Sequence, residues 1–412
     1  ALAGAGAAAA AGGGAGGGAG GGGGGSVLPL IFALQRFAVT ADLQMNMSVI
    51  QSNLGDELAW VNMEVDIWGV GVGPWRAYFN VIFTVLTVFT LLTTGHVILL
   101  SNWNRLARIK RAVSSFIRRL RRRKVKLGAV YAGFPLPSSL AWPAPEMTFM
   151  TLAVTGISKS SAGLIGDGSP LAMFVGAATI LCAPFAFLYY VVKTTRMIQR
   201  QRLPFGLSTK YYRRYRAPKM TSIIGVVRAL WHGIVGTNGV WEEPADEAHE
   251  PERTKRLIDE HPFGCWTEKD LLARHKMLVD AYTDDVWACV IYPSLDQWGT
   301  ISMAILVGYY EGLPEEKITH LSALYQAAIA FGLGVPKTLV HLFFRPVSNR
   351  LANHVSLLAV ASEVMMIAFG LLAHMGRIDG QSGAEAMLML ALLGIGLPLI
   401  YTIILAIGSL AQ

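Results

Sequence analysis

The amino-acid sequence predicts an all-α protein, a polytopic bundle of transmembrane helices. Hydrophobic residues make up 53% of the 412 residues and charged residues only 15%, with a mean hydropathy of +0.43. Soluble domains carry about 25% charged residues, so this composition excludes an ordinary soluble domain. Two apolar runs flank the connector 343–350, and each has the roughly twenty residues that a helix needs to cross a bilayer. We therefore expect a membrane hairpin over residues 320–372.

The connector of this hairpin predicts the orientation of the bundle. It contains Arg345, Pro346, Asn349 and Arg350 and no acidic residue. Short cytoplasmic loops are enriched in Lys and Arg. We therefore expect this turn to face the cytoplasm.

The N-terminal part of the chain divides into two segments. Residues 1–26 are almost entirely Ala and Gly and predict a disordered tail or linker. The chain begins without Met and without a signal peptide, so we expect a C-terminal piece of a longer protein. In the segment 27–76, residues 27–43 are apolar except for Arg36 and Asp42. They predict either an additional span or an interfacial amphipathic helix, followed by an acidic outer loop.

The first membrane helices are expected within residues 77–192. A clear span over 77–100 is followed by 102–126, where eleven Lys and Arg occur without an acidic residue. Apolar residues recur there every three or four positions, which predicts an amphipathic helix resting on the anionic inner leaflet. A solvated basic linker is the alternative. The predicted headgroup contacts in this segment are Arg118, Arg119, Arg121, Arg122 and Arg123.

A second basic cluster, 193–219, requires one further span. Its nine Lys and Arg, again without an acid, directly follow the apolar run 171–192. Both clusters favour the cytoplasmic side, so an even number of crossings must separate them. The weaker run 146–165, which contains Glu146 and Lys159, is the only candidate for the second crossing. Within the cluster, Arg213, Arg214 and Arg216 are predicted to meet lipid headgroups rather than RNA.

The remaining chain comprises a cytoplasmic loop, 193–286, and a C-terminal membrane region, 287–412. The histidines and Cys265 of the loop lack the close spacing of a metal site, so we expect neither metal nor cofactor. Four spans close the chain, over 287–310, 321–344, 354–374 and 385–407. The prediction is therefore seven spans, or eight if residues 27–43 also cross.

Three ionisable residues lie inside the last spans: Asp296, Lys337 and Glu363. Each costs roughly 2.5–3.5 kcal/mol at a helix centre unless it faces a partner or water. They lie about seven to nine residues from the cytoplasmic ends of their spans, or roughly 10–14 Å at 1.5 Å per residue, so they can meet. We expect either an ion or substrate pathway or a structural ion pair, with Glu363 as the charge left over. The sequence contains no motif of a soluble enzyme, and we expect no catalytic activity.

Short motifs in the last spans resemble a known membrane domain. The matching residues are Tyr325, Gln326 and Ala327, then Phe343, Phe344, Arg345 and Pro346, then Asn349 and Asn353. This pattern resembles the TRP-like membrane domain of fungal Flc-type proteins, also found at the C-terminus of large Cys-rich surface proteins of algae and other protists. The resemblance implies a channel-like domain behind an extracellular region, in a plasma or flagellar membrane. This chain has only three cysteines and no Cys-rich region.

Two functions follow from these expectations. In the first, the bundle conducts or gates a cation through the charged residues of the last four spans. In the second, it is a non-conducting anchor or assembly subunit for an extracellular structure. A pathway requires polar residues above and below the charges, whereas an anchor requires only a sealed ion pair. The expected partners are a bilayer with an anionic inner leaflet and other membrane or extracellular subunits, and not nucleic acid.

Overall fold

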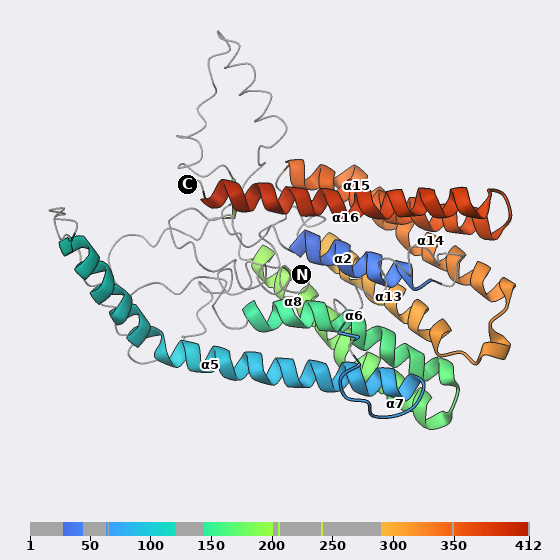
Figure 1. Cartoon of the computed structure of the whole chain (residues 1–412), viewed down its shortest axis with the longest axis horizontal. Helices are drawn as coiled ribbons and strands as arrows, with labels where there is room; N and C mark the ends of the chain where they lie inside the picture. The colour runs from blue at the N-terminus through green and yellow to red at the C-terminus, as the bar shows by residue number, and fades with distance from the viewer. Residues whose placement is uncertain are drawn as a thin grey trace, which may run out of the picture.

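The computed structural model describes residues 28–43, 63–64, 66–120, 144–200, 205–206, 240–241, 290–347 and 350–410 (Figure 1). The described chain is helical, as predicted, apart from an antiparallel pair of dipeptides, β1 (Phe205–Gly206) and β2 (Val240–Trp241). The helices are α2 (Leu28–Ala41), α5 (Pro74–Leu120), α6 (Ala144–Asp167), α7 (Pro170–Ile180), α8 (Ala186–Arg200), α13 (Tyr292–Glu311), α14 (His320–Phe344), α15 (Arg350–His374) and α16 (Gly380–Leu410), with a π-helical turn η4 (Leu181–Phe185) and a 3₁₀ turn η7 (Glu315–Lys317).

Five helical segments are long and apolar enough to cross a membrane, which supports the prediction of an integral membrane protein. They are Pro74–Asn102, Pro170–Met197, His320–Phe344, Arg350–His374 and Gly380–Ile403. The expected spans over 146–165 and 287–310 correspond to α6 and α13, which are not among these five. A total of seven or eight spans therefore stays a prediction.

The low hydropathy of α6 is explained by its position. Residues 153–164 are all buried, including Thr155, Ser158 and Lys159. Helices α5, α7 and α13 pack around α6. A helix covered by other helices needs no continuous apolar face toward lipid. Its polar residues are therefore compatible with a place inside the bundle.

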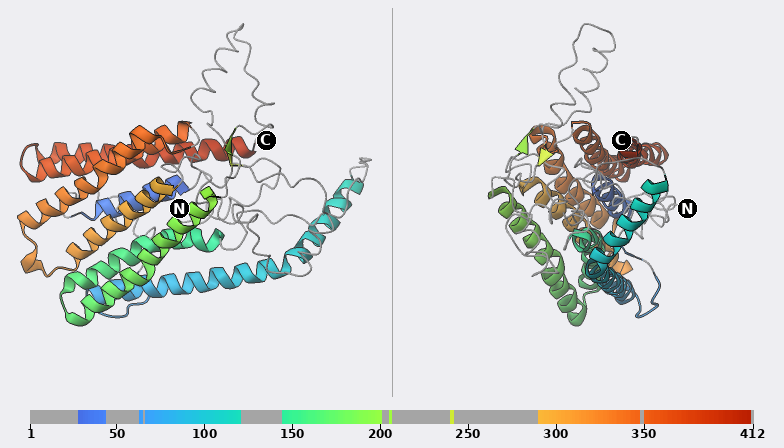
Figure 2. Two further views of the ribbon diagram at one scale, coloured as in Figure 1. Left: turned by 180° about the vertical axis from the view of Figure 1, so that it is seen from behind. Right: turned by 90° about the vertical axis from the view of Figure 1, so that its left-hand side faces the viewer.

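Helix α2 lies at the centre of the molecule. It runs between α13 and α16 in Figure 1, and the views of Figure 2 agree. It also contacts α15 and α6. Residues 35–40 are all buried, so this part of α2 leaves no polar face for lipid headgroups. With 14 residues the helix is about 21 Å long, which is shorter than the hydrocarbon core. We therefore treat α2 as an inner element of the bundle.

Helix α5 is longer than the span expected over 77–100. It continues without a break from Pro74 to Leu120, so the first part of the basic segment 102–126 extends the same helix. Its C-terminal part, drawn in teal, bends away from the other helices (Figure 1). The backbone of Arg118 and Arg119 belongs to this extension. Their side chains, the rest of the segment, and Arg213, Arg214 and Arg216 lie outside what the structure describes.

The hairpin predicted over 320–372 is formed by α14 and α15. Arg345 ends α14 in the left-handed conformation, with φ of 43°, and α15 begins at Arg350. The backbone N–H of Val347 donates to Asn353 Oδ1 at 3.3 Å, which ties the turn to α15. Pro346 lies in the turn between Arg345 and Val347. Asn349 lies outside the described residues. We call the end of the bundle that contains this turn the hairpin end. The opposite end, where α13 is linked to α14, is the link end.

Helices α6 and α13 approach each other through glycine. A Cβ atom built on Gly308 would lie 1.9 Å from the carbonyl oxygen of Lys159, and one on Gly312 would lie 2.0 Å from that of Gly163. Backbone therefore touches backbone at this crossing. Small residues allow such close packing of membrane helices.

Candidate charge clusters of the bundle interior

Four charged side chains meet in the middle of the bundle, one from each of α2, α13, α14 and α15. Arg36 Nη1 donates to Asp296 Oδ1 at 2.9 Å, and Arg36 Nε lies 3.2 Å from Glu363 Oε2. Lys337 Nζ also contacts Asp296 Oδ1. No side chain of the four is more than 7% exposed. We call these residues the central cluster; two positive charges face two negative charges in it.

The structure brings together all three residues that the sequence singled out. It also gives Glu363 a partner that the sequence analysis had not identified. Asp296 meets Lys337, one of the two partners considered for that lysine. Glu363 was the charge left over, and Arg36 of α2 now faces it. Sequence reasoning did not place Arg36 in the site. Two features of the sequence could have pointed to Arg36: a carboxylate without a partner, and an arginine inside an apolar run.

Polar side chains extend the central cluster toward the hairpin end. Tyr292 lies one helical turn before Asp296, and His341 lies one turn after Lys337. The Tyr292 hydroxyl is 2.5 Å from His341 Nδ1, and His341 Nε2 is 3.0 Å from the carbonyl oxygen of Asn353. A carbonyl can only accept, so Nε2 carries a proton. In the neutral imidazole Nδ1 is then the acceptor, and Tyr292 donates to it.

Polar groups also continue for about one turn toward the link end. Thr40 donates its hydroxyl to the carbonyl of Arg36 at 2.7 Å, and Thr300 does the same to Asp296 at 3.0 Å. Both threonines are buried. Next to Arg36 on α2, Gln35 Nε2 donates to the carbonyl of Leu152 of α6 at 2.8 Å. The central cluster is therefore part of a longer polar strip.

A second group of charges, here called the rim cluster, surrounds Lys159 at the link end. Lys159 Nζ donates to Asp42 Oδ2 at 2.6 Å and to Glu64 Oε2 at 2.9 Å, and it lies 3.1 Å from Glu311 Oε1. These carboxylates come from the end of α2, the segment before α5 and the end of α13. Three carboxyl groups thus share one ammonium group, so the rim cluster carries excess negative charge when all three are ionised.

Two carboxyls of the rim cluster have raised pKa values. Burial raises the pKa of Glu64, and the nearby Lys159 ammonium opposes the rise. Glu311 lies beyond the expected span 287–310, and burial raises its pKa to about 7 against the same opposing effect. The side chain of Glu311 keeps 41% of its surface exposed, so water screens part of these effects. The folded protein therefore binds protons at the rim more tightly than the unfolded chain.

We expect this difference to make stability fall as pH rises. A carboxyl whose pKa is raised by folding stabilises the protein fully below its unfolded pKa of about 4.5, and that contribution is lost as pH rises through about 7. Thermal unfolding in detergent between pH 4.5 and 7.5 measures it. Glu311→Gln, which cannot ionise, should flatten this dependence. The exposed Glu316→Gln is the matched control, and equal slopes for both variants would contradict the assignment.

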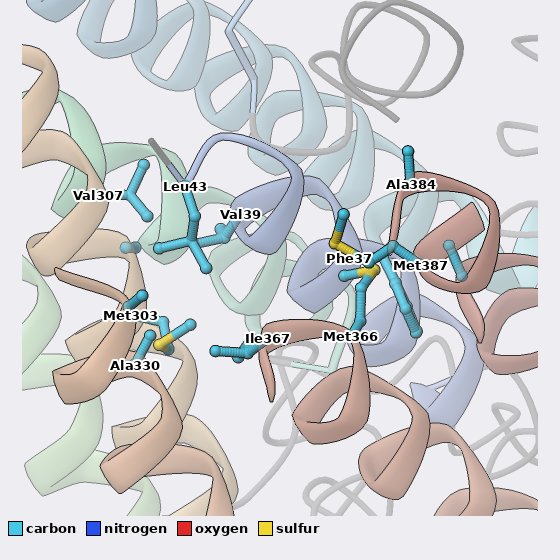
Figure 3. Close-up of a cluster of buried hydrophobic side chains, with 13 residues drawn as sticks. Phe37, Val39, Leu43, Met303, Val307, Ala330, Met366, Ile367, Ala384 and Met387 are labelled. Carbon is cyan, nitrogen blue, oxygen red and sulfur yellow. The ribbon is translucent and has the colours of Figure 1, made fainter. Parts of the chain in front are cut away.

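An apolar layer separates the two clusters. It consists of Val39, Met303, Val307, Ala330 and Ile367, all buried in one hydrophobic core (Figure 3). Val39 lies between Arg36 and Asp42 on α2, and Met303 and Val307 lie between Asp296 and Glu311 on α13. Ala330 and Ile367 lie on the link-end side of Lys337 and Glu363. The polar strip is therefore interrupted before it reaches the rim.

One more buried polar pair joins α5 to α6. His96 Nδ1 lies 2.5 Å from Glu146 Oε1, and both side chains are at most 5% exposed. Glu146, one of the two charges that weakened the expected span 146–165, thus has a partner inside the protein. Among the described residues, no group of three or more His, Cys, Asp or Glu is arranged to hold a metal ion. The histidines of the loop 193–286 lie outside the described residues.

No protein-family model, curated protein or solved structure matches the chain. The resemblance to the TRP-like membrane domain therefore stays an expectation.

Proposed function

We propose that this chain is a multi-pass membrane protein that conducts a cation through its helix bundle, with the central cluster on the path. The supporting observation is the polar strip. Charged side chains from four helices meet in the interior, and polar groups continue from them toward both ends. A pair that served only to hold helices together would need no such extension.

The apolar layer gives this pathway a closed state. An ion that crosses an apolar layer must lose its hydration shell, and hydrophobic constrictions close channels in this way. Movement of α2 relative to α13 and α15 would open the layer, because Val39 lies on α2. With its carboxyls ionised, the rim cluster would then attract cations to the link end.

The wider setting is part of the same proposal. The chain is the C-terminal, TRP-like membrane domain of a larger surface protein in a plasma or flagellar membrane. Its basic segments contact the anionic inner leaflet. These statements rest on the sequence patterns described above.

A non-conducting anchor or assembly subunit is the second candidate. The observation in its favour is charge balance: the central cluster holds two cations and two carboxylates, so its net charge is zero. Such a cluster can serve as a structural connection between helices.

Ion flux into liposomes separates the two functions. The purified chain would be reconstituted, and influx of Na⁺, K⁺, Ca²⁺ and H⁺ recorded. We expect flux in the wild type and its loss in the charge-neutral double variant Asp296→Asn/Lys337→Met. The control is Glu316→Gln/Lys317→Met, which likewise neutralises one carboxylate and one lysine, at exposed positions of the link between α13 and α14. Absence of any flux in a folded wild type would favour the anchor.

A further inference from the structure

Resting on the proposed function, we infer that the conducted cation is the proton, and that the Tyr292–His341 pair is its loading site at the hairpin-end side of the central cluster. The two side chains are buried, and their rings lie edge to face with centroids 5.0 Å apart. One hydrogen bond joins them, and a second joins His341 to a backbone carbonyl.

The donor atoms of the central cluster fit a proton better than a metal ion. A hard cation such as Ca²⁺ or Mg²⁺ needs about six oxygen ligands. Here Asp296 contacts both Arg36 and Lys337, and Glu363 faces Arg36, so the carboxylates are already engaged by fixed cations. A proton needs only one lone pair. His341 Nδ1 has such a lone pair, which accepts the hydrogen bond of the Tyr292 hydroxyl.

Loading of the proton follows from the hydrogen bonds. Nε2 of His341 already carries a proton and donates to Asn353, so an incoming proton binds at Nδ1. The imidazole becomes an imidazolium with one positive charge and two donors. The Tyr292 hydroxyl must then turn, accept from Nδ1 and point its own proton elsewhere. The Tyr292 hydroxyl then gives its own proton to an acceptor beyond the pair, for which the structure offers the Asp296 carboxylate one helical turn along α13, and its oxygen takes the Nδ1 proton. This restores the first arrangement with one proton passed on.

The charged groups around this pair favour a proton that passes rather than stays. Arg36 of α2 and Lys337 of α14 repel an imidazolium, whereas Asp296 of α13 and Glu363 of α15 attract it. Since these four charges balance, none of them holds the added charge permanently. At the link end, the carboxyls of Glu64 and Glu311 provide further proton acceptors beyond the apolar layer.

The test is proton influx into liposomes that contain a pH-sensitive dye, with the membrane potential held by K⁺ and valinomycin. We expect the wild type to pass protons and His341→Gln to reduce the rate about tenfold or more. Tyr292→Phe should also reduce it, because the hydroxyl that exchanges roles is gone. Tyr401→Phe, the same change at a buried tyrosine of α16, should pass protons at the wild-type rate.

Each other outcome overturns a different statement. Flux of Na⁺, K⁺ or Ca²⁺ without proton flux would overturn this inference and leave the proposed function standing. Proton flux that neither variant reduces would overturn the assignment to the pair. No flux of any ion would overturn the proposed function as well. If His341→Gln fails to fold, Tyr292→Phe decides the question, because it removes a single hydroxyl.

Discussion

Replacing Asp296 with Asn is expected to lower the free energy of unfolding by about 3–5 kcal/mol, because it leaves a buried ammonium group unpaired. Asp296 Oδ1 faces both Arg36 and Lys337, and among the described residues it is the only carboxylate in an ion pair with Lys337. Without it, Glu363, which faces Arg36, is the one carboxylate of the central cluster left for two buried cations. Equilibrium unfolding in mixed micelles, followed by circular dichroism, measures the loss.

The double variant Asp296→Asn/Lys337→Met is the control for this prediction. It removes one charge of each sign and leaves the pair of Arg36 and Glu363, so it should recover much of the lost stability. Lys337→Met alone should be destabilised as well, since two carboxylates then share Arg36. If Asp296→Asn and the double variant are equally unstable, the loss does not come from unpaired charge, and the electrostatic account of the cluster is wrong.

The second large effect is expected for Gly308→Ala, which should lower the free energy of unfolding by at least about 3 kcal/mol or prevent folding. The new Cβ would lie 1.9 Å from the carbonyl oxygen and 2.7 Å from the carbonyl carbon of Lys159. Insertion of extra atoms into a packed interior usually costs about 1–3 kcal/mol when side chains can move aside. Here the neighbour is backbone, so α6 and α13 must separate along their length.

Gly332→Ala on α14 is the matched control, because a Cβ there meets nothing within 4 Å. That variant should be neutral or slightly stabilised, since alanine favours helix over glycine by up to about 1 kcal/mol. The rim cluster adds a second readout. Separation of α6 from α13 would pull Lys159 away from Glu311 and weaken the effect that opposes the raised pKa of Glu311, so Gly308→Ala should show a steeper pH dependence of stability than the wild type. Wild-type stability in Gly308→Ala would show that the crossing is looser than described.

The charged residues of the last spans were the most predictable part of the site. A charge in an apolar run is costly, so it must find a partner, and the rise of 1.5 Å per residue gives its depth. This reasoning selected Asp296, Lys337 and Glu363 and predicted that they could meet. It could not assign the pairs, because depth says nothing about the face of the helix on which a side chain lies.

The inner helices were harder to predict, for a physical reason. Hydropathy detects helices that face lipid, and α2 and α6 face protein. Residues 27–43 therefore predicted either a span or a surface helix, and 146–165 was inferred only from the parity of the basic clusters. The rim cluster was missed for the same reason. Lys159 had been treated only as a defect in a span, and its three carboxylates lie in segments far apart in the sequence.

Arg36 precedes its partner Asp296 by 260 residues, and this separation determines the order in which the molecule is assembled. At roughly 5–20 residues per second, about 13–50 s of translation separate the two side chains. During that interval neither Asp296 nor Glu363 is available to the guanidinium, and an unpaired charge in hydrocarbon costs several kcal/mol. We therefore expect insertion of α2 into the bilayer to be unfavourable until α13 and α15 have been made. Although α2 precedes α13 and α15 in the chain, we therefore expect it to reach its place in the bundle only after them.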